Sequence, residues 1–394
     1  MKNNKKWLVL VGAICAQMAI GAIYSWSIFN APFAEVFGVD KGQIYQTYAI
    51  AIFFFAFATL FSGRLQISKG PRFTALVGGL LYSGGVFLSA FASSPVMLWI
   101  TYGVIAGSGV GFVYVVPLAT LIKWFPERKG AITGLAVSAF AIGGLVFKEV
   151  ATFVLGGGDA AVTQEVLRST FMTLGVIYAV FTLVGGFFLV NPDDFEAKAV
   201  AGSENDLSPK QLLGKVSFYK ILFAYFFAVM PGLLIIGLAK DIGIELVALT
   251  PVVAGGIVGI LSLVNAGGRL ASGILSDKLG GKNVIKGMYI LTIVSLAVLS
   301  FVELSLPLFY TAMIGVVVGY GSFLALFPGV VSSTFGQKYY SANYGLVYQA
   351  YGVAGLVGPI IKDNTSSLEQ TFLVAMIAAI VGCVILFSLK KQEA

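Results

Sequence analysis

The chain contains no histidine and carries very little charge. Among its 394 residues there are no His and two Cys, and charged residues make up only 11%. The absence of His excludes imidazole proton relays, histidine metal ligands and Ser/His or Cys/His catalysis. Cys15 and Cys383 both lie in apolar stretches and indicate neither a disulfide framework nor a redox compartment. We therefore expect no catalytic residues, no metal site and no cofactor.

Apolar residues dominate what is present. They form 58% of the chain, and the mean hydropathy is +0.92. A soluble domain has roughly 45–50% apolar and about 25% charged residues. This composition is typical of an all-α membrane protein whose outer surface faces the lipid bilayer. The net charge of +7 is then explained as a topology signal, and we expect no nucleic-acid partner.

Apolar stretches of about 20 residues predict transmembrane helices. The first follows Lys2, Lys5 and Lys6, but it is too long for a signal peptide and lacks a convincing cleavage site, so we assign it as a membrane helix. The twelve predicted spans are 7–34, 43–63, 73–93, 97–122, 131–155, 168–190, 218–238, 250–274, 285–303, 306–331, 343–361 and 369–388.

The distribution of Lys and Arg predicts the orientation. With the N-terminus inside, 19 of the 25 cations fall in cytoplasmic segments. Only five fall on the outer side, and Arg269 lies within a span. Because positive charge is retained in the cytoplasm, both termini are predicted to be cytoplasmic in a multi-pass cell (inner) membrane protein. The outer five are Lys41, Lys148, Arg168, Lys240 and Lys362.

The two halves of the chain repeat each other. Gly103-Val-Ile-Ala-Gly-Ser-Gly matches Gly315-Val-Val-Val-Gly-Tyr-Gly at an offset of 212 residues, and two further loci match at offsets of 211 and 210. Agreement at three separated loci indicates an internal duplication. We predict an N-terminal six-helix bundle over 1–190, a cytoplasmic linker over 191–217 and a C-terminal six-helix bundle over 218–394.

The loop GILSDKLGGK, which starts at Gly273, resembles the loop signature of the major facilitator superfamily. The resemblance implies two six-helix bundles with substrate bound between them near mid-membrane. The matching loop of the first half, GRLQISKGPR, has Ile67 where the superfamily expects Asp. A loop salt bridge on that side is therefore in doubt.

Longer motifs are similar to those of the oxalate:formate antiporter family, which includes bacterial pyruvate and lactate carriers and is related to animal monocarboxylate carriers. They cover nearly the whole chain and imply transport of small carboxylates. The motifs are GAIYSWSIFNAP, KWFPERKG, NAGGRLASGILSDK, ALFP and SANYG.

Arg269 is the residue that supports carboxylate binding most directly. It lies inside the predicted span 250–274, where a guanidinium needs an anion or access to water. Its planar fork suits a carboxylate, and Asn265, one turn earlier on the same face, can donate to a substrate oxygen. The structural alternative is that Arg269 snorkels toward the inner interface and pairs with Asp277, roughly 12 Å along the helix.

The family pattern implies that aromatic and hydroxyl side chains from both halves surround this pair. A tyrosine supplies an apolar wall with one polar tip, which suits a small organic anion. The residues at these positions are Tyr24, Tyr114, Phe140, Tyr320, Tyr348 and Tyr351.

A departure from the family narrows the substrate. Oxalate carriers of this branch have a lysine where Tyr351 stands, so only one buried cation remains here. A second carboxylate without a countercharge costs several kcal/mol at low dielectric. We therefore expect a monocarboxylate such as lactate, pyruvate or formate.

The sequence leaves two alternatives for what drives transport, proton symport and carboxylate exchange. Animal relatives have an aspartate where Asn265 stands, so that proton switch is missing, and the remaining candidates are Asp241, Glu245 and Glu149. We favour proton symport, with Asp241 preferred, and keep carboxylate exchange as the alternative. A membrane carboxylate sensor would use the same binding pocket, and a channel is a further alternative class. A membrane enzyme is disfavoured because no span has paired acids or a nucleophile motif.

Overall fold

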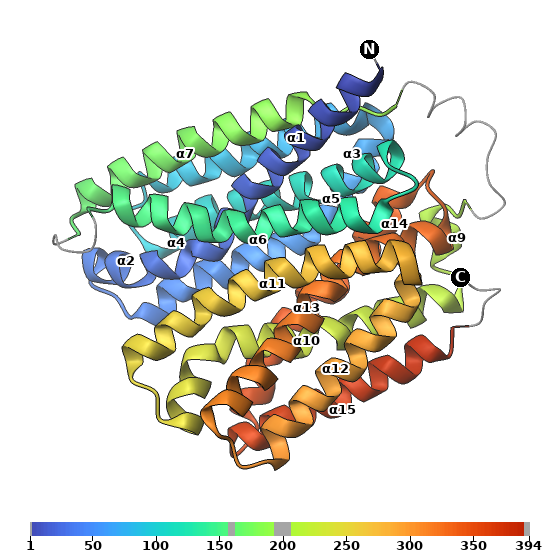
Figure 1. Ribbon diagram of the computed structural model, residues 1–394. Coiled ribbons are helices and arrows are strands. Elements are labelled where there is room, and N and C mark those ends of the chain that lie inside the picture. Colours follow the sequence, from blue (N-terminus) through green and yellow to red (C-terminus); the bar gives the residue numbers. More distant parts are fainter. Residues whose placement is uncertain (1, 157–161, 193–205, 390–394) are drawn as a thin grey trace. The chain divides into compact units, whose positions relative to one another are not determined.

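The computed structural model is helical along most of the residues it describes, which are 2–156, 162–192 and 206–389 (Figure 1). The all-α architecture predicted from the sequence is confirmed. Four acidic residues of the predicted linker lie outside the described residues, namely Asp193, Asp194, Glu196 and Glu204. Near its end the linker forms a short helix, α9 (Pro209–Leu212). Ser208 and Gln211 form a capping box at the start of this helix.

The contacts between residues divide the chain into two compact units. The first comprises Met1–Trp124, Ala139–Ala201 and Tyr344–Leu346, and the second comprises Phe125–Ser138, Gly202–Asn343 and Val347–Ala394. These units differ from the predicted halves mainly because the start of one helix, α6 (Lys129–Val154), groups with the second unit. The predicted bundle boundaries themselves stay a prediction.

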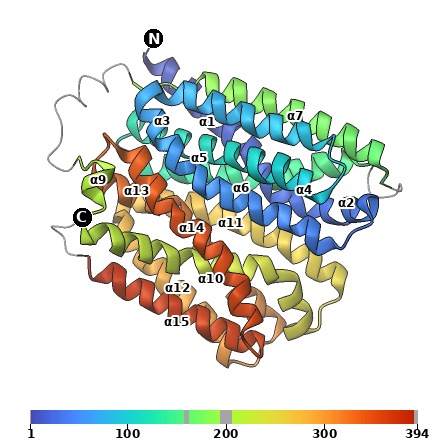
Figure 2. The same ribbon diagram turned by 180° about the vertical axis from the view of Figure 1, so that it is seen from behind.

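The first unit is built on one long helix, α3, against which α5 and α7 pack, while α1 packs on α7. The helices α1 and α7 lie side by side in both views (Figures 1 and 2). A 3₁₀ segment, Ala22–Phe29, follows α1, and a π-helical segment, Trp99–Ala106, precedes α5. The helices are α1 (Lys2–Gly21), α2 (Asn30–Phe37), α3 (Lys41–Ser89), α4 (Pro95–Leu98), α5 (Gly107–Trp124) and α7 (Gln164–Phe187).

In the second unit α13 packs against α10, α11 and α12, and α15 packs against α10 and α12. The helices α12 and α15 lie side by side in both views (Figures 1 and 2). The helices are α10 (Val216–Val247), α11 (Pro251–Leu279), α12 (Gly281–Phe301), α13 (Leu306–Phe335), α14 (Tyr340–Asp363) and α15 (Leu368–Phe387).

Within the described residues, ten helices are long and apolar enough to cross a bilayer. One of them, α3, contains two of the twelve predicted spans. The two spans are separated by a kink at Gly70, where φ is +84° and Pro71 follows. A positive φ favours glycine, and proline cannot continue the preceding hydrogen-bond ladder. The eighth predicted span falls in α11, which is not among the ten.

Glycines allow the helices of the first unit to approach closely. A Cβ at Gly109 of α5 would lie 2.6 Å from the Cα of Tyr82 and 2.7 Å from the carbonyl oxygen of Gly78, both on α3. Because the neighbouring atoms belong to the backbone, neither helix can yield without shifting. Close packing through small residues is the main source of helix association in lipid.

We predict that Gly109→Ala destabilises the folded protein by about 1–3 kcal/mol, the usual cost of overpacking. Gly84→Ala on α3 is the matched control, since a Cβ there meets no atom within 4 Å. Thermal unfolding of both variants in detergent measures the difference. Equal melting temperatures for the two variants would contradict the close contact.

Candidate functional site

Arg269 is buried in α11 and is held by two neutral acceptors. Its side chain is 1% exposed. The Nε–H donates to Oδ1 of Asn265 at 2.6 Å, and Nη1 donates to the backbone carbonyl of Val137 at 2.8 Å. These contacts use two of the five N–H donors of the guanidinium. Among the described side chains, Arg269 is the only Lys, Arg, Asp or Glu that is buried.

The predicted structural alternative for Arg269 was an ion pair with Asp277. The carboxylate of Asp277 instead accepts the backbone N–H of Gly130 at 2.8 Å and that of Ala131 at 2.9 Å. It thereby caps the first turn of α6, where a negative charge is stabilised by the helix dipole. Neither Asp277 nor any other carboxylate in the described ranges lies within salt-bridge distance of Arg269.

Two glycines bring the neighbouring backbones up to Arg269. A Cβ at Gly134 of α6 would lie 2.5 Å from the carbonyl oxygen of Arg269. A Cβ at Gly321 of α13 would lie 2.6 Å from the carbonyl oxygen of Asn265 and 3.2 Å from Cγ of Arg269. A side chain at either position would push α11 away. The close approach of α6 places the Val137 carbonyl within reach of the guanidinium.

The tyrosines predicted in the second unit form one buried cluster. The hydroxyls of Tyr320 and Tyr351 lie 3.4 Å apart. The rings of Tyr348 and Tyr351 stack with centroids 5.0 Å apart, and Tyr225 of α10 lies 6.3 Å from Tyr348. Tyr320 directly precedes Gly321 on α13, the glycine that lies close to the Arg269–Asn265 pair.

The three aromatic residues predicted in the first unit also come together. Phe140 of α6 meets Tyr24 edge-on at 5.1 Å and Tyr114 at 5.5 Å between ring centroids. Phe55 of α3 lies 5.1 Å from Tyr114 and completes the cluster. A Cβ at Gly144 would lie 3.2 Å from Cβ of Tyr24, so the glycine allows α6 to pack beside the 3₁₀ segment.

The proton-coupling candidates are separate from the buried arginine. The Glu149 side chain is 77% exposed and lies 4.0 Å from the ammonium of Lys148. Glu245, near the end of α10, is exposed. The side chain of Asp241 lies outside the described part of the chain. The two described candidates therefore have the exposure of interfacial residues.

Sequence reasoning missed three contributors to these clusters. The Val137 contact is made by a backbone carbonyl, which leaves no trace in the residue type. Phe55 stands in the run Phe53-Phe54-Phe55-Ala56-Phe57, and its neighbours give no signal that it is the one buried phenylalanine of the run. Tyr225 lies in a span rich in Phe and Tyr, so only its contact with Tyr348 identifies it.

Arg269 and the surrounding groups can hold a small anion. A buried cation without a countercharge raises the affinity for an anion, because water is excluded and the local dielectric is low. No group of three or more His, Cys, Asp or Glu that could hold a metal ion occurs among the described residues.

Comparison with known proteins identifies the family. The Major Facilitator Superfamily profile matches residues 7–359. An uncharacterized MFS-type transporter of Escherichia coli K12, YhjX, is 31% identical over 90% of this chain and 87% of its own. The oxalate:formate antiporter of Oxalobacter formigenes is 26% identical over 90% of this chain and 84% of its own.

A solved structure shows the same fold. The proton:xylose symporter XylE superimposes with a TM-score of 0.79 at 14% identity, over 98% of this chain and 96% of its own. The predicted major facilitator fold is confirmed, and the family indicates a transporter, not an enzyme. The chain belongs to the Major Facilitator Superfamily and is a multi-pass membrane transporter.

Proposed function

We propose that this protein is a secondary active transporter of small monocarboxylates such as lactate, pyruvate or formate, and that Arg269 binds the substrate carboxylate. One observation carries the proposal: the guanidinium is 1% exposed, and the contacts described above are to neutral acceptors. An arginine kept at membrane depth in this way is costly, and such residues usually mark a substrate or ion pathway.

The geometry of the pair fits one carboxylate. Asn265 uses its Oδ1 to orient the Nε of Arg269, so its amide nitrogen is the group that we assign to a substrate oxygen or hydroxyl. Arginine binds carboxylates through two parallel N–H donors, which fixes orientation as well as charge. In this arrangement Asn265 positions the fork and also contacts the substrate.

The aromatic residues are proposed as the walls of the substrate chamber. In the second unit we assign Tyr320, Tyr348 and Tyr351, whose rings and hydroxyls form one cluster. In the first unit we assign Tyr24, Tyr114 and Phe140. An apolar wall with a few hydroxyl groups disfavours a second charge, which is the basis for selecting a monocarboxylate.

The orientation in the membrane is part of the same proposal. The excess of Lys and Arg in the predicted inner loops supports cytoplasmic termini, and we propose that the protein lies in the cell (inner) membrane. The predicted six-helix bundles over 1–190 and 218–394 would move by alternating access around the bound substrate.

For coupling we infer proton symport, with Asp241 preferred over Glu245 and Glu149 as the group that takes up the proton. Carboxylate exchange is the second candidate function. It is favoured by the absence of a buried acid among the described side chains, because nothing described there can neutralise Arg269 when the carrier returns empty. The printed name of one relative is oxalate:formate antiporter.

We predict that Arg269→Lys lowers the initial rate of lactate uptake into proteoliposomes by about tenfold or more, because a point charge cannot reproduce the two-donor fork. Arg269→Gln should abolish uptake. Both variants must retain the size-exclusion profile of the parent. Uptake by Arg269→Gln at the parental rate would overturn the proposed site.

A matched pair of glycine variants sharpens this test. Gly321→Ala presses on Asn265 and on the Arg269 stem and should lower uptake, whereas a Cβ at Gly267, on α11 itself, meets no atom within 4 Å. Gly267→Ala should therefore transport at the parental rate. An equal loss in both variants would mean that general damage to α11, and not displacement of the pair, is responsible.

Discrimination by charge gives a second prediction. Lactate, pyruvate or formate should compete with labelled lactate uptake, while oxalate should compete at least about tenfold more weakly, since its second carboxylate has no countercharge. Competition assays in proteoliposomes measure the ratio. Transport of oxalate at the same rate as lactate would contradict the expected preference for a monocarboxylate.

The pH gradient separates the two coupling modes. Under proton symport, an imposed gradient that is acid on the side of entry should accelerate lactate uptake and drive accumulation above equilibrium. Under exchange, uptake should depend on carboxylate trapped inside the vesicle and be indifferent to the gradient. If transport is proton symport through Asp241, Asp241→Asn should remove the effect of the pH gradient on lactate uptake.

A further inference from the structure

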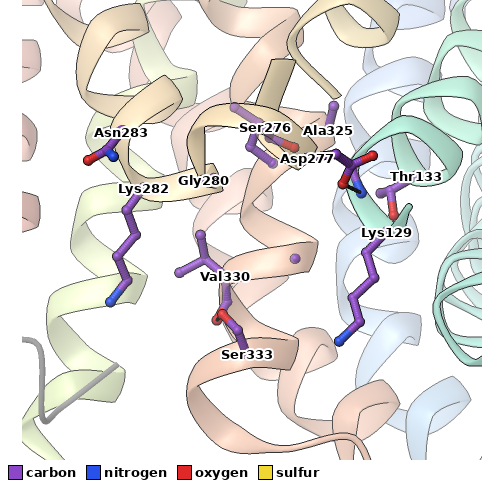
Figure 3. A pocket seen from close by; sticks show the side chains of 14 residues that line it. Lys129, Thr133, Ser276, Asp277, Gly280, Lys282, Asn283, Ala325, Val330 and Ser333 are labelled. Atoms are coloured by element: carbon purple, nitrogen blue, oxygen red, sulfur yellow. Dashed lines mark hydrogen bonds between the residues drawn. The ribbon is translucent and has the colours of Figure 1, made fainter. Parts of the chain in front are cut away.

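A cavity lies within the second unit, and its lining does not include Arg269 or Asn265. It has a volume of about 420 Å³. The first turn of α6, the end of α11, the start of α12 and the last turns of α13 form its walls (Figure 3). On the predicted topology these helix ends are cytoplasmic.

Two lysines from different helices line this cavity. Lys129 begins α6 and Lys282 lies in the first turn of α12, and both side chains are half-buried. Figure 3 shows them on opposite sides of the cavity, with Val330 and Ser333 between them. Neither has a carboxylate within salt-bridge distance in the ranges described. The one acid in the lining, Asp277, already accepts the two backbone N–H groups of α6.

The lining also offers a buried hydroxyl that has no partner. Thr133 is 1% exposed, and its Oγ1 makes no hydrogen bond within the described structure. A buried polar atom of this kind requires an explanation, and a ligand or an ion is one. In Figure 3 Thr133 lies beside the start of the Lys129 side chain, whose ammonium extends away from it, so both side chains come from the wall formed by α6.

The opposite wall is a glycine turn that opens a helix. Gly280 has φ +83°, and α12 begins at Gly281 with no side-chain cap. A Cβ at Gly281 would meet no atom within 4 Å, so there is room for a ligand to approach this backbone. Uncapped N–H groups at a helix start, next to a lysine, favour phosphate and similar anions.

We propose that this cavity binds a dianionic phosphate group, carried either by a soluble phosphorylated compound or by a phosphomonoester lipid headgroup such as that of phosphatidic acid. Lys129 and Lys282 supply the two positive charges, while Thr133 and the start of α12 supply hydrogen bonds. A tetrahedral dianion uses both cations and several donors at once, whereas a monocarboxylate would leave one lysine uncompensated. A bound phosphate would link the first turn of α6 to α12.

Thermal unfolding of the purified full-length protein tests this proposal. Inorganic phosphate should raise the melting temperature in an uncharged detergent relative to chloride at equal ionic strength. Lys129→Gln and Lys282→Gln should each weaken the apparent affinity for phosphate by about tenfold or more, the usual effect of losing one charge-assisted contact. Thr133→Val keeps the shape of the side chain and should weaken it less.

Lys278→Gln is the control, because Lys278 is exposed near the end of α11 and does not line the cavity. It should bind phosphate like the parent. The lipid arm uses nanodiscs of phosphatidylcholine with or without phosphatidic acid. Stabilisation by phosphatidic acid that is lost in the two lysine variants, with no response to inorganic phosphate, supports the site and assigns it to a headgroup.

Two outcomes would overturn the proposal. One is no stabilisation of the parent by either inorganic phosphate or phosphatidic acid. The other is an equal loss in Lys278→Gln and in the two cavity variants, which would indicate general charge screening at the surface. The test is independent of the proposed transport site, because Arg269→Gln should keep the full response to phosphate.

Discussion

Arg269, the one buried cation among the described side chains, sets the main constraint on this protein. Removing a guanidinium from water costs several kcal/mol, and neutral partners repay only part of that cost. Arg269 has an amide oxygen and a backbone carbonyl as acceptors, and neither neutralises its charge. The described structure therefore keeps a cation without a countercharge, and we propose that a substrate carboxylate supplies that charge, because a carboxylate fits a planar fork.

Glycine makes this arrangement possible in helices that are otherwise apolar. Gly134 lets the backbone of α6 approach Arg269, and Gly321 does the same for α13. Close approach turns the Val137 carbonyl, normally hidden within the helix, into a usable acceptor. The polar character of the site thus comes largely from backbone positions and from two residues of α11, which is why a chain with so little charge can still build it.

The sequence predicted the parts that depend on composition and helical spacing. The Asn265–Arg269 pair follows from an i, i+4 spacing, and the clusters around Phe140 and around Tyr348 gather residues that the family pattern had named. The Val137 carbonyl could not be predicted, because a backbone acceptor has no residue signature. The bond from Asp277 to α6 was also missed: it joins residues almost 150 positions apart, and the spacing along α11 alone suggested Arg269 as the partner.

The two proposed anion sites differ in how far water reaches them, and this difference supports a different anion for each. Arg269 is almost fully buried, so each additional charge on a ligand must be desolvated without a partner, and a single carboxylate is preferred. Lys129 and Lys282 are only half-buried, so their attraction is weakened by solvent and salt, and a useful affinity requires a ligand that engages both. A dianion with several acceptor oxygens meets that requirement, whereas a monocarboxylate does not.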